Sequence, residues 1–161
     1  MKKGFSLIEI VMGVALFAIL GTVSSVMLLS AMRGARKAAA INIAKNEGQF
    51  ALNAMVQTTR FAKNAVCSGA VTLTKTDDTT VVYDLAGGVI TEQVGAETNN
   101  LTGEKVTVTA CGGSMFTCNG RNVQICFNID SATASDVTES AGSVGTGIMF
   151  TTTVVLRNWG I

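Results

Sequence analysis

Between Glu9 and Arg33 the chain carries no charged residue, and this run of 23 residues, Ile10–Met32, limits the possible folds more than any other feature. As a helix rising about 1.5 Å per residue, the run would be about 34 Å long, enough to cross a hydrocarbon core of about 30 Å. The run is too long for the apolar part of a secretory signal, and no clear Ala-x-Ala cleavage site closes it. We therefore expect a transmembrane helix over residues 5–32.

Charge is distributed unevenly along the 161 residues, although the formal net charge is only +1. Residues 33–63 hold six Lys or Arg against one acidic residue, whereas residues 64–161 hold four Lys or Arg against nine Asp or Glu. Basic residues flank the apolar run on both sides, so charge alone does not fix its orientation in a membrane. The small net charge gives no bulk electrostatic case for nucleic acid, and DNA is not indicated as a partner.

Histidine and proline are absent from the sequence. Without histidine the chain cannot build a Ser-His or Cys-His nucleophile pair, and it lacks the commonest metal ligand. Zinc would need all four cysteines, whose spacing lacks paired C-x-x-C motifs. We expect no enzymatic activity, no metal site and no cofactor.

An acidic residue stands directly before the apolar run, in the string Lys3-Gly4-Phe5-Ser6-Leu7-Ile8-Glu9. A plain membrane anchor has no use for Glu9, although a carboxylate at headgroup level costs little. The order and spacing of this string resemble the type III signal of type IV prepilins and pseudopilins. The resemblance covers about the first 30 residues.

That resemblance implies that residues 1–4 are a leader, removed by a prepilin peptidase between Gly4 and Phe5, and that Phe5 is then N-methylated. It also implies that Glu9 takes part in assembly with other pilin subunits at an inner-membrane assembly platform. The freed amine of Phe5 would be mostly positive at neutral pH and would keep its charge on methylation. In an apolar filament core, Glu9 of a neighbouring subunit would neutralise it, because an unpaired buried charge is expensive.

The segment that follows, residues 33–66, is expected to continue as an amphipathic stem helix to about Asn64. Ile43, Phe50, Ala54 and Phe61 fall on one face, and a second apolar row lies beside it, formed by Leu52, Val56 and Ala62. Together they predict a broad stripe that receives a β-sheet. Gly48 is expected to weaken the helix locally.

From Cys67 onward the apolar pattern alternates with a period of two, which predicts a β-rich head over residues 67–161. Strands are expected around 71–73, 81–85, 89–94, 105–109, 122–129 and 148–157. A turn is expected at 76–79, and a long polar loop at 131–147. A long helix followed by an antiparallel sheet is an α+β arrangement, and it agrees with the pilin fold that the resemblance implies.

Parts of the head are also similar to minor pilins and J-type pseudopilins, which have a strand-rich head and a last strand ending near Leu-Arg-Asn. The matching segments are 83–85, 101–108 and 151–158. This similarity favours a minor subunit that initiates the filament or lies at its tip.

Four cysteines, Cys67, Cys111, Cys118 and Cys126, fall in a head that an N-in helix would place outside the cytoplasm. Export favours two disulfides over free thiols. Three pairings are possible, and the sequence does not choose among them. Cys111–Cys126 and Cys118–Cys126 are the preferred candidates because each closes a loop between two strands, and Cys67 would then pair with the remaining cysteine.

Two kinds of function fit these patterns. The first is a structural subunit of a type IV pilus, or of a type II secretion or competence pseudopilus, held in membrane lipid before assembly and displayed at the cell surface or in the periplasm afterwards. The alternative is a single-pass, signal-anchored exported binding domain that never polymerises.

Overall fold

A computed structural model describes residues 7–131, 147–158 and 160 of the chain. The predicted cleavage site at Gly4 and Phe5, and nearly all of the predicted loop 131–147, lie outside these residues. The chain divides into two compact units, residues 1–38 and 39–161, and each is described by itself.

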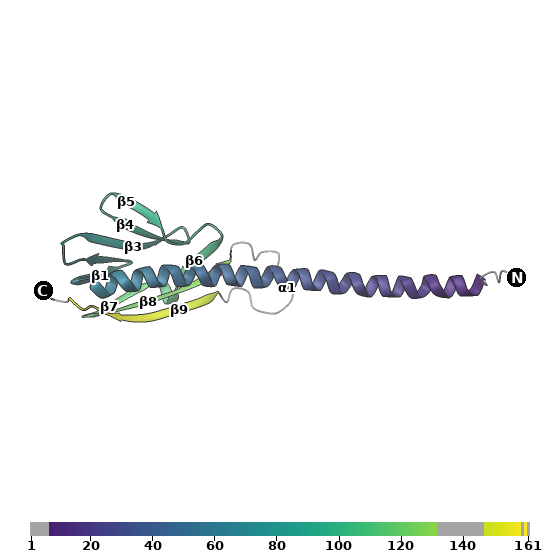
Figure 1. The fold of residues 1–161 in the computed structure, drawn as a ribbon. Helices are drawn as coiled ribbons and strands as arrows, with labels where there is room; N and C mark the ends of the chain where they lie inside the picture. The colour runs from purple at the N-terminus through teal and green to yellow at the C-terminus, as the bar shows by residue number, and fades with distance from the viewer. Residues whose placement is uncertain (1–6, 132–146, 159, 161) are drawn as a thin grey trace. The chain divides into compact units, whose positions relative to one another are not determined.

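One helix, α1 (Leu7–Phe61), contributes to both units (Figure 1). We call residues 7–38 its anchor half and residues 39–61 its head half. In the anchor half every residue is exposed except Gly13, which is partly exposed. Hydroxyl groups in this half are bonded within the helix: Ser24 Oγ donates to the Leu20 carbonyl and Ser25 Oγ to the Gly21 carbonyl, both at 2.8 Å. Such local bonds let hydroxyl side chains sit in an apolar helix without unpaired groups.

The head half of α1 packs against the strands through small residues. Its buried positions follow one another at spacings of three and four residues and are Ala44, Gly48, Ala51, Met55 and Thr59. The predicted stripe was therefore wrong at Phe50 and Phe61, which remain 61% and 55% exposed, whereas Ile43 and Ala54 are partly buried and pack against the core. Of the second predicted row, Ala62 is buried and Leu52 and Val56 are partly buried against the core.

The helix ends at Phe61, about three residues before the predicted end, and the head begins with a strand at Asn64. Five antiparallel strands form the first sheet in the order β1-β2-β3-β4-β5. They are β1 (Asn64–Ser68), β2 (Ala70–Thr74), β3 (Thr80–Ala86), β4 (Val89–Val94) and β5 (Glu97–Asn100). Every β5 side chain is exposed, so this edge strand had no alternating pattern to predict it.

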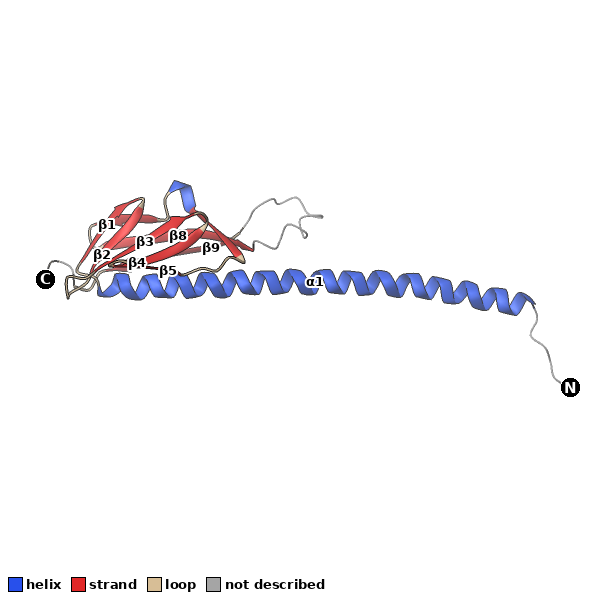
Figure 2. Ribbon diagram, turned by 90° about the horizontal axis from the view of Figure 1, so that it is seen from above, coloured by secondary structure: helices blue, strands red, loops and turns tan. Residues whose placement is uncertain are grey.

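The second sheet is built around the long strand β8, with β6 and β7 paired to it and β9 paired to it as well. Its members are β6 (Val106–Ala110), β7 (Phe116–Asn119), β8 (Asn122–Ser131) and β9 (Ile148–Val155), and a short 3-10 helix, η1 (Cys111–Gly113), follows β6. All pairings are antiparallel. The α+β prediction holds at this level: one long helix and antiparallel sheets (Figure 2).

Within the second unit, apolar side chains of both sheets and of the head half of α1 form one core. Fully buried members include Met55 of the helix, Leu73 and Tyr83 of the first sheet, and Ile125 and Phe127 of the second. Alternate residues of β8 enter this core, as a half-buried strand requires. Burial at about 25 cal/mol per Å² of apolar surface makes this core the main stabilising contribution to the unit.

Candidate functional site

Two features of the described chain are candidates for function, and the first is the exposed anchor half of α1. It is the one helix in the described part of the chain that is long and apolar enough to cross a membrane. Its large apolar side chains are about half to four-fifths exposed, from Leu7 at 80% to Met32 at 48%. A surface of this kind is stable only against lipid or against another apolar surface.

Glu9 lies in the first turn of the described helix and is exposed. A carboxylate in the first turn is favoured by the helix dipole. Phe5, its expected electrostatic partner from another subunit, lies outside the described residues. The structure therefore places Glu9 at the start of the apolar surface and leaves its pairing as a prediction.

A second apolar surface lies on the head half of α1, where the exposed side chains of Phe50 and Phe61 form what we call the uncovered stripe. The strands of the head cover the neighbouring face of the helix and leave this one half-exposed, with Phe50 and Phe61 more than half accessible. Both phenylalanines were identified from the sequence, but as core residues. Their exposure gives the head half a surface for packing against another molecule.

Polar contacts tie the head half of α1 to the first sheet and to the loop that follows β5. The Glu47 carboxylate accepts a hydrogen bond from the Gly103 backbone N–H at 3.1 Å. Glu47 is the one acidic residue among the six basic residues of the segment 33–63. The Tyr83 hydroxyl donates to Glu92 Oε1 at 2.6 Å and lies 2.9 Å from Thr58 Oγ1 of the helix. Burial, followed by the hydrogen bond with Glu92, raises the pKa of Tyr83, so the phenol stays protonated through the neutral range.

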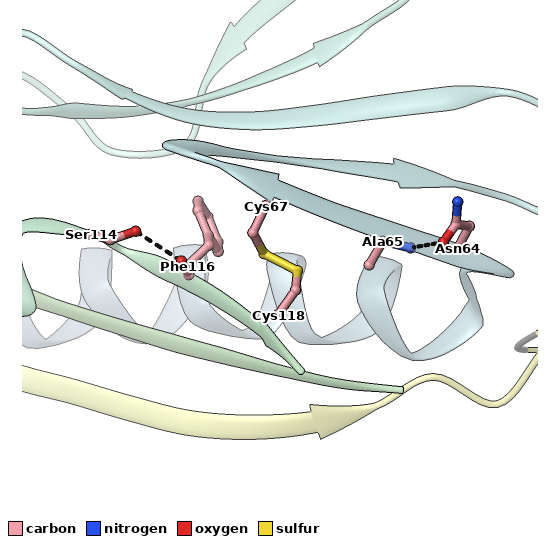
Figure 3. Close-up of a disulfide and its surroundings, with 6 residues drawn as sticks. All are labelled: Asn64, Ala65, Cys67, Ser114, Phe116 and Cys118. Atoms are coloured by element: carbon pink, nitrogen blue, oxygen red, sulfur yellow. Dashed lines mark hydrogen bonds between the residues drawn. A yellow bond between two sulfur atoms is a disulfide. The ribbon is translucent and has the colours of Figure 1, made fainter. Parts of the chain in front are cut away.

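Two disulfides join segments of the head. Cys111 pairs with Cys126 across 15 residues, and Cys67 pairs with Cys118 across 51 residues. Of the preferred candidates, the first is therefore the one present, and Cys67 binds the remaining cysteine. Cys67 lies on β1 and Cys118 on β7, so this bond links the two sheets, beside the ring of Phe116 (Figure 3). A second link between the sheets is the hydrogen bond from Val108 N–H to the Gly88 carbonyl, at 2.8 Å.

The segment after β9 closes the end of the helix. Arg157 N–H donates to the Arg60 carbonyl at 3.0 Å, and Asn158 Nδ2 donates to the Phe61 carbonyl at 3.1 Å. Carbonyls in the last turn of a helix have no partner within it, so these two bonds supply what the helix lacks. The Leu-Arg-Asn segment that carried the sequence similarity thus has a structural use in this chain.

The described residues include few candidate sites for chemistry. Among the described residues, no three His, Cys, Asp or Glu side chains lie together in a way that could hold a metal ion. An open depression of about 410 Å³ on the first sheet is lined by Thr79, Thr80, Val82, Gln93, Val94 and Gly95. None of these side chains titrates near neutral pH. The depression offers hydroxyl and amide groups without a general base.

Comparison with known proteins found no relative of this chain. No family model matches the chain, and neither the curated proteins nor the solved structures contain a match.

Proposed function

We propose that this chain is a structural subunit of a type IV pilus or of a related secretion or competence pseudopilus. In this proposal the subunit is inserted in the membrane through the anchor half of α1, with its disulfide-bonded head outside the cytoplasm. A prepilin peptidase cuts the chain between Gly4 and Phe5, and the mature subunit then assembles with others through its helix. The subunit is a minor one, initiating the filament or lying at its tip.

One observation carries the proposal: residues 10–32 of the anchor half of α1 are uncharged and expose their large apolar side chains, and a carboxylate stands in the first turn of the helix. A simple anchor needs the apolar surface only. A helix that must pack beside the freed amine of a neighbour needs the carboxylate as well, because it neutralises a charge in an apolar environment. If the helix were only a membrane anchor, Glu9 would have no role.

The head supports the same proposal less specifically. Two disulfides fit an oxidising compartment outside the cytoplasm. The uncovered stripe extends apolar surface onto the part of α1 that carries the head. A filament in which neighbouring helices pack side by side would cover this stripe, whereas an isolated anchored domain would leave it in water.

Mass spectrometry of the mature protein from cells that contain a prepilin peptidase tests the processing step. We expect a chain that begins at Phe5 and carries one methyl group on its α-amine. An intact Met1, or cleavage beyond Leu20, would instead support the exported binding domain that does not polymerise.

Replacing Glu9 tests assembly separately from insertion. Glu9→Gln removes the charge and keeps the size, so we expect normal membrane insertion and cleavage but little or no incorporation into sheared filaments. Glu97→Gln is the matched control, because Glu97 is an exposed carboxylate of the edge strand β5. Equal incorporation of the two variants would contradict the proposed role of Glu9.

A further inference from the structure

Three cationic side chains follow the uncharged run of α1 within two turns of the helix. They are Arg33, Arg36 and Lys37, and all three belong to the unit of residues 1–38. Residues three and four apart are neighbours on the surface of a helix, with Cβ atoms about 5–6 Å apart. Arg36 and Lys37 therefore both lie beside Arg33. We call these three residues the basic cluster.

The basic cluster has no acidic counterpart among the described residues. All three of its members are exposed, and no ion pair joins any of them to another residue that the structure describes. Along the helix the nearest acidic residues are Glu9 and Glu47, each more than two turns away, and Glu47 already accepts the hydrogen bond from Gly103 N–H. Like charges at these spacings destabilise a helix, so an anion bound between them would stabilise it.

The position of the basic cluster along α1 decides which anion it meets. Residues 10–32 are about 34 Å long as a helix, close to the thickness of a hydrocarbon core of about 30 Å. A polar headgroup layer of about 5–8 Å lies on each side of that core, and Lys37 lies about 7–8 Å beyond Met32 along the helix. When α1 crosses a membrane, the cluster therefore lies in the headgroup layer, at the depth of the lipid phosphates.

We propose that the basic cluster is a binding site for an anionic phospholipid, at the end of the apolar run that the head follows. The two guanidinium groups can each bind phosphate oxygens through parallel hydrogen bonds, and the ammonium of Lys37 adds a third positive charge. A lipid held at this site fixes the depth at which the apolar run ends in the bilayer. The inference goes beyond the proposed function, since it requires only that α1 crosses a membrane, in a filament subunit or in a plain anchor alike.

The experiment uses the purified full-length chain in detergent, with phosphatidylglycerol and phosphatidylcholine of the same acyl chains added in equal amounts. Native mass spectrometry counts the molecules of each lipid that stay bound, and we expect phosphatidylglycerol to be in excess. The main variant combines Arg33→Gln, Arg36→Gln and Lys37→Gln, and glutamine keeps the helix because it is a good helix former. One cation near an anionic lipid surface changes binding about fivefold, so loss of all three should reduce the excess at least about tenfold.

Two control variants separate charge and position from other effects of substitution. Arg33→Lys combined with Arg36→Lys keeps three positive charges and should retain most of the excess. Lys75→Gln, Lys105→Gln and Arg157→Gln together remove the same charge from the head and should leave the excess unchanged. Every variant retains the two lysines that precede the helix, so their contribution cancels from the comparison.

A main variant that keeps the excess of phosphatidylglycerol would overturn the proposal, as would a head variant that loses it to the same degree. Displacement of phosphatidylglycerol by inorganic phosphate at a matched concentration would assign the cluster to a free anion and overturn it too. Filaments formed by a chain without lipid preference would end this inference alone. Lipid preference in a chain that is neither cleaved nor polymerised would end the proposed function alone.

Discussion

The two halves of α1 use apolar residues in opposite ways. In the anchor half the large side chains point outward and none is buried, as with Phe17 at 79% and Met27 at 68% exposure. In the head half the buried positions belong mostly to small residues, and the two phenylalanines are exposed. Hydrophobic content alone would rank the anchor half as the better core helix. Its apolar surface is instead exposed, and is available to lipid or to another apolar surface.

The difference shows what a helix needs in order to lie close against a sheet. Gly48 has no side chain, and the ring of Phe150 from β9 occupies the space beside it. That ring stacks on Phe127 of β8, with centroids 5.3 Å apart. A larger residue at position 48 would push the helix away, since interiors are packed without spare volume.

The largest effect on stability is expected from truncating Met55 of the head half, with Met27 of the anchor half as the matched control. Met55 is fully buried in the head half, so Met55→Ala should lower the free energy of unfolding of the head by about 2–5 kcal/mol, through lost burial and a residual cavity. Met27→Ala makes the same chemical change at an exposed position of the anchor half and should leave that free energy unchanged. Denaturant unfolding of the detergent-solubilised full chain, followed by near-UV circular dichroism, measures both.

The contrast between the two methionines is the control for this test. Equal destabilisation by the two substitutions would mean that the anchor half contributes to the stability of the head, and would contradict the separation of roles. No loss with Met55→Ala would mean that the head half of the helix is not part of the core.

Much of the fold could be predicted from the sequence because its strongest signals are local. The uncharged run predicted the long helix, and alternating segments such as 105–109 and 122–129 predicted strands that the structure contains. The edge strand β5 could not be found this way, because it is polar and exposed throughout and is held by pairing with β4.

The buried face of the head half was missed for a different reason. Sequence patterns identify large apolar residues as core, which favoured Phe50 and Phe61 over Ala44, Gly48 and Ala51. Only the position of Phe150, about 100 residues away, makes a glycine the residue that fits. The disulfide pairing likewise depends on contacts between distant segments, so spacing along the chain could not select it.

An intermediate effect on the stability of the head is expected from substituting Gly48. A Cβ added at Gly48 would meet Phe150 Cζ at 2.6 Å, so Gly48→Ala should destabilise the head by about 1–3 kcal/mol despite the better helix propensity of alanine. Gly34→Ala is the matched control in the anchor half, where nothing lies within 4 Å of the added carbon. That change should leave the unfolding of the head as it is in the unsubstituted chain. A Gly48→Ala variant as stable as wild type would show that the ring can move aside at no cost.

The smallest effect on stability is expected from a substitution in the uncovered stripe. This substitution is also the sharpest test of the comparison between the two halves of α1. Phe50→Gln replaces an exposed aromatic residue with a good helix former, so the free energy of unfolding should change by no more than about 0.5 kcal/mol. Filament yield should nevertheless fall, because the proposed packing between subunits would lose one of its two large side chains on this face. Asn53→Gln, at an exposed polar position of the same helix, should change neither quantity. A stable Phe50→Gln variant with full yield would confine the assembly surface of α1 to its anchor half. A destabilised one would mean instead that Phe50 supports the core, as the sequence pattern first predicted.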